Sequence, residues 1–205
     1  RRGAQAGGHI VERYLDVARA LGCQVGKVVF PLADIAADRD AAQNIMKQAG
    51  LDTAKRYVLF MVGANWPNKR WPIRHYAALA DWLCDRQIIP VVAGGGVIDE
   101  DMASGIAAAA KNVPINIVGQ TTLSQLAAVI RRASLVLGGD TGPVHLAAGL
   151  QRPVVMVMGP TDANRNGPYG QTENAIEAER ICRYCWKRVC PQGLDCLACI
   201  TPEMV

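Results

Sequence analysis

The chain has 205 residues, half of them apolar and a fifth charged, with a formal net charge of +4. This size and composition predict a globular domain with its own core, and the mild basic excess suits an anionic ligand. Four Trp, five Tyr and two Phe residues are not interleaved with basic stretches as in a single-strand binding groove, so we expect no nucleic-acid partner. The longest apolar runs, at 88–93 and 153–158, are far shorter than the roughly 20 residues of a membrane span.

Residues 1–56 are expected to form a connecting region that packs onto the main domain. An apolar stripe at helical spacing runs from Ile10 to Leu21 and stops at Gly22, so it predicts a helix. A Val-Val-Phe run at 28–30 predicts a short strand, and residues 41–50 predict a second helix.

From residue 57 onward, short apolar runs alternate with helical patterns. Strands are expected at 57–62, 88–93, 115–118, 134–137 and 153–157, and helices at 73–86, 99–111, 122–132 and 143–150. Repeated strand–helix units and strands that are apolar almost throughout indicate a parallel sheet covered on both faces. We therefore predict a doubly wound, Rossmann-like α/β domain over residues 57–180.

Residues 181–205 form a cysteine-rich tail that ends at Thr201-Pro202-Glu203, the order typical of a helix start. The chain is therefore expected to be a fragment that ends in a truncated helix. Two C-x-x-C pairs could close a tetrahedral zinc site, with Cys190 as a fifth thiol. These pairs are Cys182 with Cys185 and Cys196 with Cys199. Reduced structural thiols and a redox-responsive cluster are the alternatives, and without an export signal a reducing cytoplasm is expected.

The strongest motif is Gly-Gly-Asp-Thr-Gly-Pro-Val-His at 138–145, between a predicted strand and a predicted helix. Its glycines let the backbone approach an anion, Pro143 suits a first helical turn, and the helix N-terminus favours phosphate. Asp140 is expected to cap the helix or orient a ligand hydroxyl, and Thr141 to donate to phosphate. The pattern alone equally allows an ordinary strand–helix turn.

A second motif follows the first buried strand, at 61–72, and contains Asn65, Lys69, Trp71 and Pro72. Ligands of open parallel sheets bind outside the carboxyl ends of the strands, so Lys69 and Asn65 are placed to meet the same anion as the Asp140 loop. The alternative reading makes Lys69 and its neighbour Arg70 solvated loop charges.

The two motifs together resemble glycosyltransferase family 9, the heptosyltransferases. In that family a Gly-Ala-x-x-x-x-Lys-x-Trp-Pro segment precedes an Asp-(Ser/Thr)-Gly-x-x-His segment, and this chain has the first at 63–72 and the second at 140–145. The cysteine-bearing stretch is similar to the segment before the family's last helix. The resemblance covers nearly the whole chain and implies the C-terminal lobe of a two-lobed GT-B fold.

The resemblance implies inverting transfer of heptose from an ADP-activated donor to the lipopolysaccharide core, with no required metal or cofactor. It assigns donor contacts to Asn65, Lys69, Asp140, Thr141, Gly142 and Pro143, with His145 behind them and Asp99 or Glu100 facing the ribose. The family often carries Ser or Thr near the position of Asn65, so local hydrogen bonding is expected to differ there.

The resemblance places the catalytic carboxylate and the acceptor-binding surface on an N-terminal lobe that this sequence does not contain. We therefore assign no catalytic residue and expect the chain alone to be inactive. A cytoplasmic location is expected, with at most peripheral association at the inner face of the inner membrane. Two other functions remain open: a metal- or redox-responsive module centred on the cysteines and, less favoured, a nucleotide-sugar epimerase, which should lack the Lys69–Pro72 context.

Overall fold

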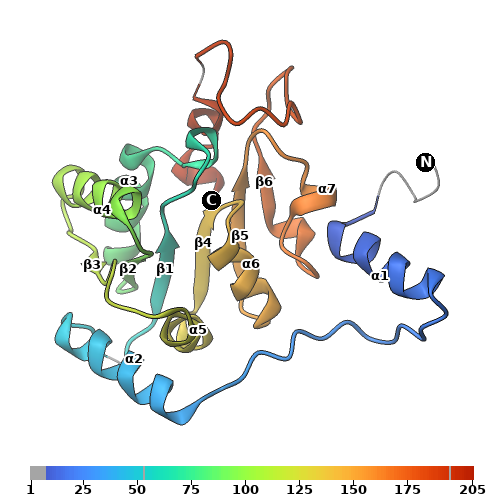
Figure 1. Ribbon diagram of the computed structural model, residues 1–205. Helices are drawn as coiled ribbons and strands as arrows, with labels where there is room; N and C mark the ends of the chain where they lie inside the picture. The colour runs from blue at the N-terminus through green and yellow to red at the C-terminus, as the bar shows by residue number, and fades with distance from the viewer. Residues whose placement is uncertain (1–7, 53, 194) are drawn as a thin grey trace.

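The computed structural model describes residues 8–52, 54–193 and 195–205. Six parallel strands form one sheet in the order β3-β2-β1-β4-β5-β6 (Figure 1). They are β1 (Tyr57–Met61), β2 (Ile89–Ala93), β3 (Ile115–Asn116), β4 (Leu135–Gly139), β5 (Val154–Met158) and β6 (Ala175–Glu177). The order reverses between β1 and β4, so the predicted doubly wound parallel sheet is confirmed and its switch point lies there.

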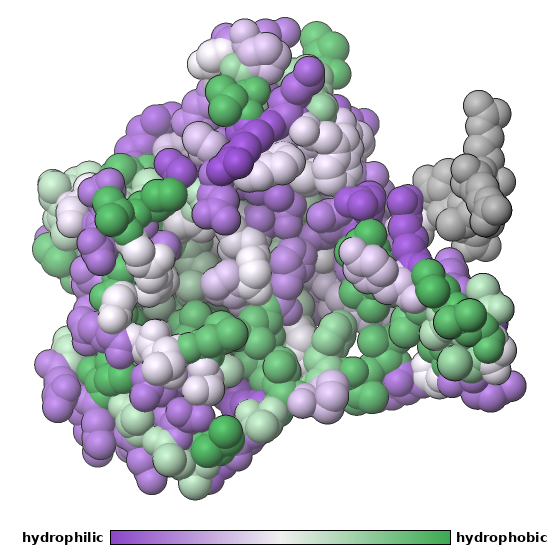
Figure 2. All heavy atoms as spheres, viewed as in Figure 1, coloured by the Kyte–Doolittle hydropathy of each residue, from purple (hydrophilic) through white to green (hydrophobic). Residues whose placement is uncertain are grey.

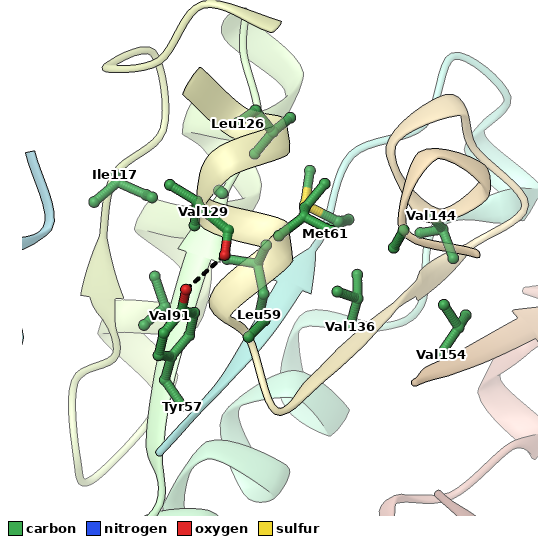
Figure 3. Close-up of a cluster of buried hydrophobic side chains, with 14 of the residues drawn as sticks. Tyr57, Leu59, Met61, Val91, Ile117, Leu126, Val129, Val136, Val144 and Val154 are labelled. Carbon is green, nitrogen blue, oxygen red and sulfur yellow. Dashed lines mark hydrogen bonds between the residues drawn. The ribbon is translucent and has the colours of Figure 1, made fainter. Parts of the chain in front are cut away.

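Helices cover both faces of the sheet, because each buried strand places alternate side chains on opposite sides (Figure 1). The main ones are α3 (Ile73–Cys84), α4 (Val97–Ala109), α5 (Leu123–Arg132) and α6 (Gly142–Gly149). Figure 3 shows the core cluster that includes side chains of α5 and α6, where Leu59 and Val136 point to the same side. There the Tyr57 hydroxyl donates a hydrogen bond of 2.6 Å to the Val129 carbonyl.

The connecting region differs in part from the prediction. Helices α1 (Ile10–Ala20) and α2 (Ala36–Gln48) form, and α2 buries Ala42 and Met46 in the core cluster shared with α5. The predicted strand at 28–30 is wrong: the segment crosses the surface between α1 and α2 without joining the sheet, and Val29 is 70% exposed. β-branched residues alone do not make a strand without an edge to pair with.

Helix α1 buries no side chain, and Figure 2 shows apolar residues on its surface. Its N-terminal end is joined to residues 167–169: a ring nitrogen of the N-cap residue His9 pairs with the Gly167 carbonyl, the rings of His9 and Tyr169 are in edge contact, and the Tyr169 hydroxyl donates to Glu12. None of the helices in the described part of the chain is long and apolar enough to cross a membrane.

Several short elements were not predicted. β6 was missed because three residues are too few to show an alternating pattern. The others are η1 (Pro67–Lys69), α7 (Ala163–Asn166), η2 (Thr172–Asn174) and η3 (Cys196–Cys199). The expected final helix forms only the short turn η4 (Pro202–Met204), while Leu197 and Ile200 of the tail are fully buried in the second core cluster.

Candidate functional site

A cavity of about 670 Å³ opens at the carboxyl ends of β1, β2 and β4, at the switch point of the sheet. Open α/β sheets bind ligands at this position. Its wall is formed by Met61, Lys69 and residues 63–66, 94–99 and 140–143. The cavity therefore brings together seven of the residues expected at the site: Asn65, Lys69, Asp99, Asp140, Thr141, Gly142 and Pro143. Glu100 and His145 are not part of the wall.

Asp140 directly follows β4, and its buried carboxylate is the centre of a polar network. Its Oδ2 atom accepts hydrogen bonds from Lys69 Nζ at 2.6 Å and from Thr161 Oγ1 at 2.8 Å. Its Oδ1 atom lies 2.9 Å from Nε2 of His145. Burial by itself raises the pKa of Asp140, but the hydrogen bonds with His145, Lys69 and Thr161 outweigh it and lower the pKa to about 2. The carboxylate is therefore charged at neutral pH.

This network corrects one expectation for Asp140. The N-cap residue of α6 is Thr141, and no side chain makes a capping hydrogen bond there. The oxygens of Asp140 instead bind Lys69, Thr161 and His145, so the carboxylate holds the lysine in place. Sequence reasoning missed Thr161, although it follows β5, the strand next to β4, and such strand ends line the sites of parallel sheets.

Lys69 ends the turn η1, and its side chain is only 15% exposed. The ammonium lies between the Asp140 carboxylate and the Trp66 ring, whose centre is 4.6 Å from Nζ. The backbone of this turn touches β4, because a Cβ atom added to Gly139 would lie 2.1 Å from the Lys69 carbonyl oxygen. A glycine at 139 thus allows the two loops of the site to meet.

We expect the substitution Gly139→Ala to destabilise the fold by about 1–3 kcal/mol, as overpacking of a rigid site does. The added methyl group must displace the Lys69 backbone, which cannot move without disturbing η1. Urea unfolding would measure the loss. Gly142→Ala is the matched control, since a Cβ atom at Gly142 meets nothing within 4 Å. Equal stability of the two variants would contradict the close approach.

The N-terminus of α6 and the hydroxyl of Thr141 border the cavity. Helix α6 begins at Gly142, which lines the cavity, so the positive end of its dipole lies there, although Pro143 has no N–H and the Val144 N–H donates to the Thr141 carbonyl. In the described part of the chain, the Oγ1 atom of Thr141 is buried and has no hydrogen-bond partner. Together with the Lys69 ammonium, these groups favour an anion in the cavity.

Asp99, in the first turn of α4, joins the ends of two strands. Its Oδ1 atom accepts a hydrogen bond of 3.0 Å from the backbone N–H of Gly63, just after β1, and the Gly95 N–H also donates to the carboxylate. Burial is the main influence and raises the pKa of Asp99. Added Cβ atoms at Gly63 and Gly94 would lie 2.4 and 2.2 Å from this carboxylate. Asp99 therefore shapes the cavity wall, and its contact with a ribose stays a prediction.

Comparison with known proteins identifies the family. The model of glycosyltransferase family 9 (heptosyltransferase) matches residues 1–194. The chain belongs to glycosyltransferase family 9. Lipopolysaccharide heptosyltransferase 1 of Pseudomonas aeruginosa is 28% identical over 90% of this chain and 49% of its own length. The Escherichia coli K12 enzyme of that name is 30% identical over 84% of this chain and 51% of its own length, so the chain spans about half the length of these relatives.

Solved structures of the family have the same fold. The glycosyl transferase family 9 protein of Veillonella parvula matches 99% of this chain and 59% of its own, with a TM-score of 0.82 and 26% identity. The E. coli ADP-heptose lipopolysaccharide heptosyltransferase II matches 96% of this chain and 59% of its own, with a TM-score of 0.74 and 26% identity. The E. coli heptosyltransferase WaaC with ADP matches 99% of this chain and 56% of its own, with a TM-score of 0.66 and 27% identity.

Three cysteines of the tail of this family 9 chain, Cys182, Cys185 and Cys190, lie close enough to Cys196 to affect its thiol. Burial raises the pKa of Cys196 to about 11, and the thiols of Cys190, Cys185 and Cys182 add to this effect. The Cys199 thiol instead donates to the Cys196 carbonyl. Across residues 8–52, 54–193 and 195–205, no three His, Cys, Asp or Glu side chains are grouped so that they could hold a metal ion. Metal binding by the four predicted cysteines stays a prediction.

The tail that carries these cysteines is hydrogen-bonded to the segment that contains Lys69. The Asn68 side chain donates a hydrogen bond of 2.6 Å to the Lys187 carbonyl, and Trp71 Nε1 donates one of 2.8 Å to the Ile200 carbonyl. Both donors flank Lys69 and Arg70 in the sequence. The tail thus fixes the turn from which Lys69 projects.

Proposed function

We propose that this chain is the donor-binding lobe of a heptosyltransferase and binds ADP-heptose in the cavity at the switch point. The observation that carries the proposal is the Lys69 ammonium, held by Asp140 beside the N-terminus of α6 and the unpartnered Thr141 hydroxyl. A lysine and a helix N-terminus that meet in one cavity suit a diphosphate. The same groups would stabilise the charge that develops on the leaving ADP, without a metal.

The comparisons support this choice of ligand. Two of the matched structures are E. coli heptosyltransferase WaaC with ADP and with ADP-2-deoxy-2-fluoro heptose. Family membership favours a transferase over a nucleotide-sugar epimerase. The lysine and the helix N-terminus in the cavity likewise favour a donor-binding lobe over a metal- or redox-responsive module centred on the cysteines.

We place the general base and the lipopolysaccharide core acceptor outside this chain. A base must offer a free acceptor atom to the attacking hydroxyl. The two carboxylates of the cavity wall, Asp99 and Asp140, are instead used by backbone N–H groups and by Lys69, Thr161 and His145. The proposed inverting transfer therefore needs a second lobe, and this chain alone should be inactive. We propose that the transfer takes place in the cytoplasm.

Calorimetric titration of the 205-residue chain with ADP in the presence of EDTA tests the proposal. We expect one ADP site, weaker binding of AMP because it lacks the second phosphate, and a melting temperature that rises with ADP concentration. Binding that is absent in EDTA and restored by a divalent cation would contradict the metal-free site. No binding under either condition would overturn the proposed function.

A further inference from the structure

Trp66 lies beside Lys69 because both side chains leave the same short turn. The Lys69 N–H donates a hydrogen bond of 3.0 Å to the Trp66 carbonyl, which closes η1. Trp66 is the N-cap residue of η1 and Lys69 is its last residue, and the ammonium lies over the indole ring, 4.6 Å from ring centre to Nζ. Both side chains line the cavity at the switch point.

The turn that carries this pair is anchored on two sides. Asn68, between the two residues, is bound to the Lys187 carbonyl of the tail. The Lys69 carbonyl rests against Gly139 of β4. The backbone that carries the ring and the ammonium is therefore held in place on both sides.

We infer that Trp66 is a positioning residue for the donor diphosphate: its ring face holds the Lys69 ammonium at the cavity wall. Asp140 accepts one of the three N–H groups of Lys69, and a single contact would leave a long flexible side chain free to swing about it. The negative face of the indole attracts the ammonium from a second direction and excludes water from that side. The remaining N–H groups are then available to phosphate oxygens. This inference rests on the proposed function.

A double-mutant cycle on ADP binding separates this role from simple packing. Trp66→Leu should weaken ADP binding about two- to thirtyfold, which is the range of a partly desolvated cation–π contact. Trp66→Phe should lose less, because it keeps an aromatic face. In the Lys69→Met background, Trp66→Leu should cause no further loss, because no ammonium remains to be held.

The chain contains a matched control in Trp82, whose ring lies 3.8 Å from the Arg86 guanidinium. Trp82 is 49% exposed and lies on α3, outside the cavity wall. Trp82→Leu should leave the affinity for ADP unchanged. The change in tryptophan fluorescence on ADP binding should persist in Trp82→Phe and be lost in Trp66→Phe.

Equal losses from Trp66→Leu in the unaltered chain and in the Lys69→Met background would overturn the inference, because Trp66 would then act independently of the ammonium. If Trp66→Leu does not fold, the same cycle with Trp66→Met, which also removes the aromatic face, decides. Absence of ADP binding by the unaltered chain would overturn the proposed function and this inference together. Normal ADP binding with an additive cycle would overturn the role of Trp66 alone.

Discussion

Replacing Lys69 with methionine should weaken ADP binding about ten- to a hundredfold, the value of a charge-assisted hydrogen bond to phosphate. Methionine keeps an apolar stem beside Trp66 but removes the ammonium that lies 2.6 Å from Asp140. Calorimetric titration at two salt concentrations would measure the loss. It should be larger at low salt, where charge interactions are less screened.

Lys111→Met provides the control, because Lys111 is exposed and does not line the cavity. Its affinity for ADP should equal that of the unaltered chain. Removal of Lys69 also deprives the buried Asp140 charge of its lysine partner, so each variant must first be shown to be folded at the titration temperature. Unchanged ADP affinity in a folded Lys69→Met chain would contradict the assignment of the site.

The sequence predicts the fold well where burial dictates the pattern. β1, β2, β4 and β5 are apolar runs because parallel strands covered on both faces admit few polar side chains, and their alternation with helices predicts a parallel sheet. The run at 28–30 has the composition of a strand, but its backbone joins no sheet. Whether such a run finds an edge depends on tertiary structure, which composition does not report.

For the site as for the fold, the sequence predicts the general arrangement but not every contact. The rule that ligands bind at strand ends correctly brings Lys69 and Asp140 to one cavity, although 71 positions separate them. The hydrogen-bond partners of each carboxylate depend on the register of the neighbouring strands and on the course of the loop backbones. The spacing of residues in the sequence reports neither. Sequence reasoning therefore missed Thr161 as a partner of Asp140, and it did not foresee that Asp99 binds the backbone of Gly63.

Asp140→Asn should destabilise the fold by about 3–5 kcal/mol, the usual result of removing one member of a buried ion pair. The Asp140 side chain is 5% exposed and that of Lys69 15%, so solvent screens this pair weakly. The substitution keeps the size of the side chain, removes its charge and replaces one acceptor oxygen with an NH2 donor. Urea unfolding at pH 7 would measure the loss, and Asp101→Asn, at an exposed position of α4, should cost little.

The dependence of the free energy of unfolding on pH below 5 is an independent test of the same carboxylate. The pKa of Asp140 falls from 3.8 to about 2 on folding, so its contribution is fully present above pH 3.8 and is lost as the pH falls towards 2. A shift of this size corresponds to about 2 kcal/mol. The unaltered chain should therefore lose about 2 kcal/mol more between pH 5 and pH 2 than Asp140→Asn does. Parallel curves for the two proteins would show that the Asp140 network does not stabilise the charged carboxylate.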